Sequence, residues 1–200
     1  MDSNCFFVEE RKNIIVFAEK NYNMLKLAAD NASIVKYGNE CEGIGCLFPK
    51  IYKSVCKGKY GRFINTIGLL NSYTIYEFDH YNRPLRIRKI DNNKCYETIY
   101  FLEYNMSLYA ITFFGDSNRY FKSTVIYKFI VNNEILLSFS FFSTYRLDEF
   151  EFFYDNYPHI TMIESDSYLS DNMELSTKRY FFEYDIGNRG KICNLKRLSK

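Results

Sequence analysis

The sequence contains no tryptophan, only three prolines and only two histidines among its 200 residues. It has no serine-rich or proline-rich linker that would divide it into independent domains. The longest apolar run, Ile135 to Phe142, is interrupted by Ser138 and Ser140 and is much shorter than the roughly 20 residues of a membrane-spanning helix. Residues Met1 to Cys5 lack the basic region and apolar core of a secretory signal. We therefore expect a cytoplasmic protein.

Sequence motifs that support catalysis are also missing. The chain has no nucleophile motif, no glycine-rich phosphate loop and no metalloprotease spacing. His80 lies next to Asp79, and His159 lies close to Asp155, but both histidines fall where hairpin turns are predicted. A general base also needs a positioned partner and a pocket. The sequence therefore predicts a protein that is not an enzyme.

The six cysteines are scattered along the chain, at positions 5, 41, 46, 56, 95 and 193. Cys41, Cys46 and Cys56 form a loose cluster. However, they lack the close pair with two intervening residues that is typical of zinc sites, and neither histidine is near them in the sequence. Buried free thiols are the usual state of such cysteines in a cytosolic protein. We expect no metal and no cofactor.

Aromatic residues, in contrast, are abundant, with 19 tyrosines and 19 phenylalanines. Between Thr74 and Leu195 they recur in five related segments, each followed by a turn and then by an apolar residue. Residues two apart in a strand share a face, and the Asn, Asp, Gly and Pro residues between the segments favour turns. The five segments are Tyr76 to Asp79, Tyr100 to Glu103, Tyr127 to Phe129, Phe152 to Asp155 and Phe182 to Asp185.

This pattern predicts a mainly β fold in which residues 63–200 form a long antiparallel meander. About ten strands is close to the size at which an open twisted sheet curls, so we expect a strongly curved sheet or half-barrel. Residues 1–62 are predicted to form a small α/β cap at the amino terminus of one integrated domain.

The cap has a mixed pattern. Cys5 to Val8 and Ile14 to Phe17 have the composition of short strands. Apolar residues between Ala18 and Ala29 recur at three and four residues, which predicts a helix. A second hairpin that turns through Asp30 and Asn31 is the alternative.

Charge is strongly segregated although the net charge is only +2. Residues 43–76 contain no acid but carry five bases, with aromatic side chains between them. Such a segment could contact phosphates and stack on bases, so nucleic-acid binding is one possible function. The residues involved are Lys50, Lys53, Lys57, Lys59 and Arg62, with Tyr52, Tyr60 and Phe63.

The acidic block is stronger, because residues 147–177 contain eight acids and neither lysine nor arginine. The polar stretch from Asp166 to Thr177 lacks periodicity and is predicted to be a long loop, where binding residues tend to lie. An anionic surface with aromatic anchors is typical of an interface for a cationic protein. The candidate partner-binding residues are Asp148, Glu149, Glu151, Tyr154, Asp155, Tyr157, Glu164, Asp166, Tyr168, Asp171 and Glu174.

Two of the aromatic segments resemble a known repeat. Tyr76 to Asp79, followed by Arg83, and Phe182 to Asp185, followed by Arg189, are similar to the YD repeat of bacterial Rhs and teneurin-like shells. The middle segments lack the Asp and the Gly-Arg of that repeat, and five copies are too few to enclose a shell.

In type and composition the chain also resembles the immunity proteins encoded beside bacterial polymorphic toxins, including those of Rhs and contact-dependent inhibition systems. This resemblance implies a tight, non-catalytic inhibitor of one cognate toxin domain. A carbohydrate-binding scaffold, with its aromatic residues lining a groove, is a further alternative.

Overall fold

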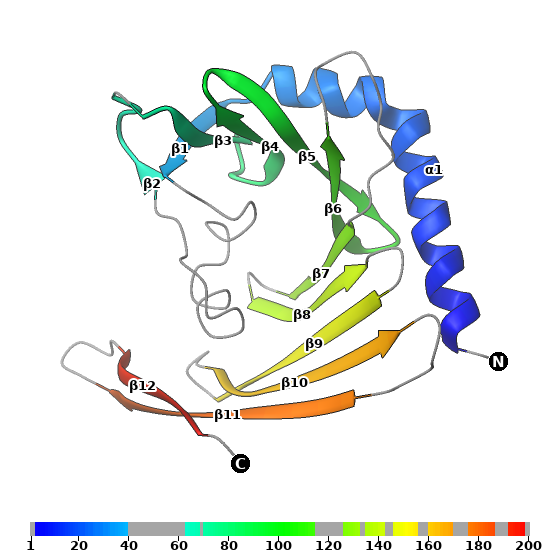
Figure 1. Ribbon diagram of the computed structural model, residues 1–200, viewed down its shortest axis with the longest axis vertical. Helices are drawn as coiled ribbons and strands as arrows, with labels where there is room; N and C mark the ends of the chain where they lie inside the picture. Colours follow the sequence, from blue (N-terminus) through cyan, green and yellow to red (C-terminus); the bar gives the residue numbers. More distant parts are fainter. Residues whose placement is uncertain are drawn as a thin grey trace.

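The structure is a computed structural model of the chain, and it shows a mainly β protein with one amino-terminal helix (Figure 1). The described residues form a sheet of twelve strands that curls but does not close, and all neighbouring strands are antiparallel. The predicted curved antiparallel meander is therefore confirmed. The structure describes residues 3–39, 63–68, 70–114, 126–132, 135–142, 146–155, 160–169, 176–186 and 192–198.

The order of strands in the sheet follows the sequence almost throughout. From β3 to β12 each strand pairs with the next, and β1 lies between β3 and β2 at one edge. The strands are β1 (Ile34–Asn39), β2 (Phe63–Ile64), β3 (Ser72–Phe78), β4 (Pro84–Asp91), β5 (Lys94–Tyr104), β6 (Ser107–Phe114), β7 (Ile126–Asn132), β8 (Ile135–Phe142), β9 (Arg146–Tyr154), β10 (Ile160–Leu169), β11 (Ser176–Ile186) and β12 (Ile192–Leu198).

Helix α1 (Ser3–Asp30) corrects the prediction for the amino terminus. The predicted helix from Ala18 to Ala29 is confirmed, but the predicted strands at 5–8 and 14–17 are wrong because these residues are helical. The hairpin through Asp30 and Asn31 is also wrong. Buried Ile14 extends the helical spacing of Ala18 towards the amino terminus, and packing of this stripe against the sheet outweighs local strand preference.

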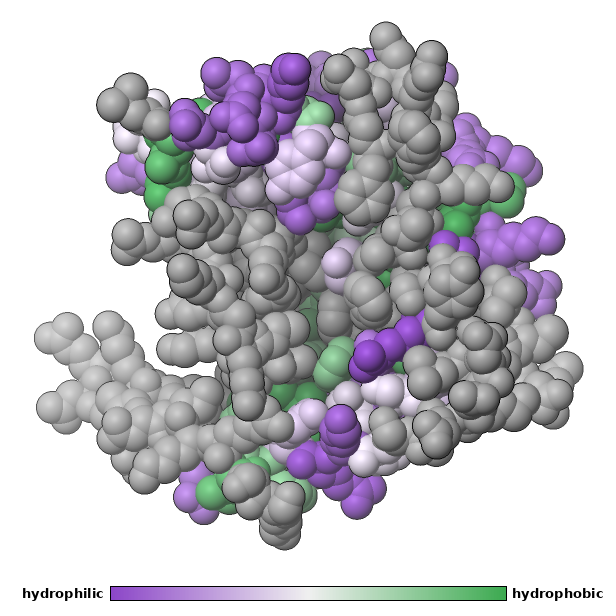
Figure 2. Space-filling view, in the orientation of Figure 1, coloured by the Kyte–Doolittle hydropathy of each residue, from purple (hydrophilic) through white to green (hydrophobic). Residues whose placement is uncertain are grey.

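The two faces of the sheet bury different clusters. The concave face holds the larger cluster, which includes Tyr76, Phe101, Phe129 and Phe152. The convex face packs against α1, which lies along the outside of the curl (Figure 1). Hydrophilic side chains gather on the outer side where α1 lies (Figure 2). The helix thus covers part of the convex face.

Each of the five aromatic segments lies in the first strand of a hairpin, namely β3, β5, β7, β9 or β11. In the second segment the first aromatic residue does not face the concave core, and the residue after it does. Phe101 joins that core, whereas Tyr100 points the other way and packs edge-on against Tyr22 of α1 at 5.5 Å. Adjacent aromatics in a strand point to opposite faces, so the sequence alone left this choice open.

Two tight hairpin turns use left-handed backbone conformations, as their asparagines suggest. Asn92 and Asn93 have φ of 47° and 62°, and Asn105 and Met106 have φ of 46° and 59°. Positive φ at both central residues is the geometry of a type I′ turn, whose twist matches that of the flanking strands. These turns fix the register of β4 with β5 and of β5 with β6.

Candidate functional site

The acidic block forms two paired strands, β9 and β10, with carboxylates opposite one another. Glu149 is the register partner of Asp166, and Glu151 is the partner of Glu164. Side chains two residues apart share a face, so all four lie together on the convex face. We refer to Glu149, Glu151, Glu164 and Asp166 as the acid ladder.

The predicted loop from Asp166 to Thr177 is wrong at both ends. Strand β10 continues to Leu169 and β11 begins at Ser176, while residues 170–175 lie outside the described part of the chain. Within the stretch, Asp166 and Thr177 are register partners in β10 and β11. The Thr177 hydroxyl, for example, donates a hydrogen bond of 2.7 Å to Asp166.

Acid opposite acid is an unfavourable arrangement for a sheet. Opposite charges across a strand pair stabilise it, whereas like charges directly opposite one another destabilise it by a comparable amount, on the order of 0.2–1 kcal/mol per pair. The ladder contains two such like-charged pairs in succession. Strand pairing itself therefore does not explain why these residues are acidic.

Cations from neighbouring strands partly neutralise this face. Arg179 of β11 forms an exposed ion pair with Glu164 at 2.8 Å, which lowers the pKa of Glu164 and raises that of Arg179. Lys128 of β7 binds Glu10 of α1 at 2.7 Å. Although residues 147–177 carry no base, the fold brings bases to them. For Glu151 and Asp166 the described residues show no ion pair.

Glu149 is a half-buried carboxylate of the ladder. Burial raises its pKa above the usual 4.5; nearby Lys128 acts in the opposite direction, whereas the charges of Asp166 and Glu10 raise the pKa further. The folded state therefore binds a proton at this carboxyl more tightly than the unfolded chain does. The stability that comes with this proton is fully present below pH 4.5 and is lost as pH rises through the folded-state pKa.

Replacement of Glu149 by glutamine should therefore stabilise the protein at pH 7, because the mutant no longer buries a charge there. The advantage over wild type should shrink as the pH falls towards 4, where Glu149 itself becomes neutral. Urea unfolding at several pH values between 4 and 7 measures this difference. The control is Glu103→Gln, at an exposed acid outside the ladder whose 3.9 Å ion pair with Arg83 is also exposed, and it should leave the urea midpoint close to that of wild type. A constant difference across the pH range would contradict the argument.

Several of the predicted partner-binding residues lie away from the acid ladder. Asp148 is buried on the opposite face from Glu149, accepts a 2.6 Å hydrogen bond from Ser167 and forms an ion pair with Arg146. The Tyr154 hydroxyl donates to the carbonyl of Leu136 at 2.5 Å, at the concave core.

Tyr168 packs with the cluster under α1, and Asp155 is half-buried just beyond the end of β9. Tyr157, Asp171 and Glu174 lie outside the described residues, as do Lys50, Lys53, Lys57, Lys59 and Arg62 of the basic segment, and Cys41, Cys46 and Cys56. Of the eleven candidates, the fold thus brings the four ladder carboxylates together.

Three charged residues near the acid ladder were not among the candidates predicted from the sequence. They are Glu10, Lys128 and Arg179. Glu10 also accepts a 2.6 Å hydrogen bond from the Tyr109 hydroxyl, and burial with this bond raises the pKa of Tyr109. Arg179 could have been found by pairing β11 with β10 as consecutive antiparallel strands. Glu10 and Lys128 are 118 residues apart, and no local pattern in the sequence links them.

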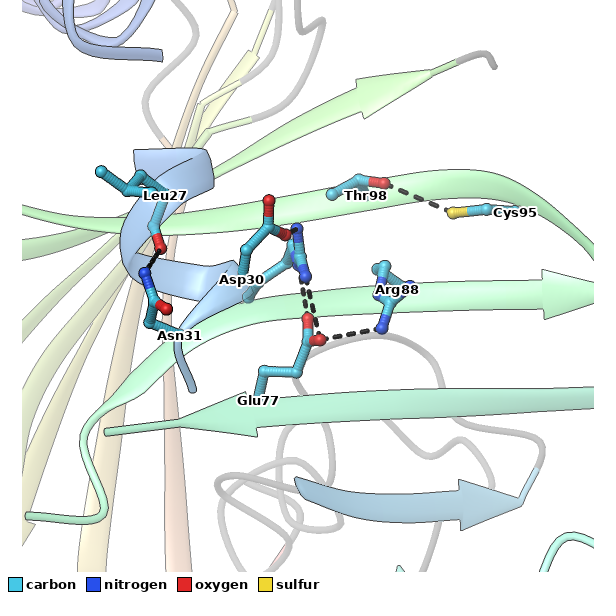
Figure 3. Close-up of polar contacts among 8 residues, drawn as sticks. Leu27, Asp30, Asn31, Glu77, Arg88, Cys95 and Thr98 are labelled. Carbon is cyan, nitrogen blue, oxygen red and sulfur yellow. Dashed lines mark hydrogen bonds and ion pairs between the residues drawn. The ribbon is translucent and has the colours of Figure 1, made fainter. Parts of the chain in front are cut away.

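A second polar cluster joins the carboxyl end of α1 to β3 and β4. Buried Arg86 binds Glu77 with two nitrogens and Asp30 of α1 at 2.8 Å, and Arg88 binds Glu77 at 2.8 Å. Figure 3 shows Glu77 and Asp30 converging from the strand and the helix end. Burial lowers the pKa of Arg86, but the hydrogen bonds to Glu77 and Asp30 outweigh it, so the guanidinium keeps its charge.

The remaining candidates from the sequence are a metal site, the cysteines and the two histidines. No group of three or more His, Cys, Asp and Glu side chains among them is arranged to hold a metal ion. Cys95 is a half-buried free thiol. The ring of His80 lies against that of Tyr81 in the exposed β3–β4 turn, with centroids 3.7 Å apart and the ring planes tilted by 44°. His159 lies outside the described part of the chain. No helix in this part of the chain combines the length and apolarity that a membrane crossing requires.

The fold and the ladder together define a curled, open antiparallel meander with an amino-terminal helix and an acidic stretch of its convex face. Comparison with protein-family models, with curated proteins and with solved structures gave no match.

Proposed function

We propose that this chain is a cytoplasmic bacterial immunity protein that binds a cognate toxin domain and neutralises it without catalysis. The observation that carries the proposal is the acid ladder, in which Glu149 faces Asp166 and Glu151 faces Glu164. These pairs repel each other in the free protein, and a cationic partner surface would relieve the repulsion. A cationic partner would thus gain binding energy from carboxylate pairs that the pairing of β9 with β10 does not stabilise.

A toxin that degrades nucleic acid fits the charge of this surface. Nuclease domains need cationic surfaces to hold phosphates, and an anionic inhibitor that covers such a surface excludes the substrate. Opposite charge also accelerates the encounter between the two proteins. A nucleic acid itself would be repelled by the ladder, so the proposal requires a protein partner for this face.

The first test is capture of partners from native cells by the full chain, with a low-salt wash and mass spectrometry of the bound proteins. We expect one stoichiometric partner with a basic, toxic domain. The double variant Glu151→Lys and Asp166→Lys should bind this partner at least about tenfold more weakly, because two contacts become repulsive. Far-UV circular dichroism should show that the variant is still folded.

The matched control reverses two exposed acids outside the ladder, Glu19 and Glu103, to lysine. It changes the net charge by the same amount and should leave affinity within about twofold, apart from a general effect on encounter rate. Equal losses for both double variants would indicate non-specific attraction. Recovery of nucleic acid in place of a protein would overturn the proposal.

A further inference from the structure

The acid ladder continues into a third, apolar pair on the same face. Along β9 the convex side chains that follow Leu147 are Glu149, Glu151 and Phe153, and each has a register partner in β10. The partner of Phe153 is Met162, which in turn pairs with Phe181 of β11. We refer to Phe153, Met162 and Phe181 as the apolar row.

Helix α1 covers the other end of these strands. Leu147 of β9 and its register partner Tyr168 of β10 pack in the cluster that contains Ile14 and Ala18 of α1. Phe153, at the opposite end of β9, is 39% exposed. Along β9 the convex face thus passes from a helix-covered apolar pair, through two acidic pairs, to an apolar pair with an exposed phenylalanine.

We propose that the acid ladder and the apolar row form one docking surface, and that its occupant is a basic, extended segment of a partner protein. The segment carries two cationic side chains followed by one apolar side chain, each two residues apart. This proposal rests on the proposed function, since it names the chemistry of the toxin segment that the ladder receives.

The spacing of the face selects this occupant. Residues two apart in a strand are about 6.6–6.8 Å apart, so a second extended chain alongside β9 has the same period. Its cations would meet the pairs Glu149–Asp166 and Glu151–Glu164, and its apolar residue would meet the apolar row. The described residues show no ion pair for Glu151 or Asp166, so both have capacity for an incoming arginine.

The two parts of the surface have different roles in binding. Charged contacts set the encounter rate and reject wrong partners, whereas a buried aromatic anchor commonly provides much of the affinity. An exposed phenylalanine next to four carboxylates therefore distinguishes this face from a solvated acidic surface. Charge complementarity excludes an acidic occupant, and the apolar row favours a protein segment over a simple polycation.

The test uses a labelled peptide of sequence Thr-Arg-Thr-Arg-Thr-Leu-Thr as the probe and the full chain as the receptor, with binding followed by fluorescence anisotropy. Two further peptides replace either the leucine by serine or both arginines by glutamate. We expect the serine peptide to bind at least fivefold more weakly and the glutamate peptide not to bind. Receptor Phe153→Ser should abolish the preference for leucine over serine.

A matched receptor control is Tyr96→Ser, which removes an exposed aromatic residue of β5. It should leave the leucine preference unchanged. If the arginine peptide binds no better than the glutamate peptide, the charge basis of the proposed function fails as well. If arginine is required but neither the leucine nor Phe153 matters, only the inferred apolar contact is overturned.

Discussion

Replacement of Arg86 by methionine should lower the free energy of unfolding by about 3–5 kcal/mol, because it leaves a buried carboxylate without its main partner. Glu77 is buried and accepts hydrogen bonds from two Arg86 nitrogens, and Arg86 also ties Asp30 at the end of α1 to the sheet. Among the described residues, Arg88 is then the one cation still paired with Glu77 in the mutant. Urea unfolding followed by circular dichroism measures the loss.

The control for this prediction is Arg83→Met. Arg83 forms an exposed ion pair with Asp79 at 2.7 Å, and such pairs contribute little to stability, so this variant should unfold at nearly the same urea concentration as wild type. Adding Glu77→Leu to Arg86→Met should restore part of the stability, since an apolar pair replaces a buried charge. A loss below about 1 kcal/mol for Arg86→Met would show that the network is not needed for stability.

Replacement of Ile14 by alanine should destabilise the protein by about 2–5 kcal/mol through the cavity it leaves between α1 and the convex face. Ile14 is fully buried, at 0% exposure, in the cluster with Ala18, Leu102, Tyr109 and Ile111. Two residues away on the same helix, Val16 is 40% exposed. Thermal or urea unfolding of Val16→Ala, the matched control, should show a change of no more than about 0.5 kcal/mol.

The comparison of Ile14→Ala with Val16→Ala also tests which side of α1 packs against the sheet. A helix that did not dock through the Ile14 side would show similar, small effects for both substitutions. An equal loss at both positions would instead indicate a helix that is buried all round. Either result would contradict the packing of α1 described above.

The hairpins could be predicted from the sequence because their signals are local. Alternating aromatics such as Tyr76 and Phe78 define a strand face, and turn residues such as Asn105 define where the chain reverses. A period of two residues and a turn residue both act within a few positions. The length of α1 was not predictable in this way, since Ile14 to Phe17 has the composition of a strand and becomes helical through its packing on the sheet.

By itself the sequence determined that the chain is an antiparallel meander with two segregated charge blocks, since alternation, turn chemistry and composition are properties of neighbouring residues. Only the tertiary structure decided which acids act together. Strand register placed Glu149 and Glu151 opposite Asp166 and Glu164 and turned Asp148 to the other face. Long-range packing brought Glu10 to Lys128. Register and packing depend on the free energy of the whole sheet and helix, and no short stretch of sequence contains that information.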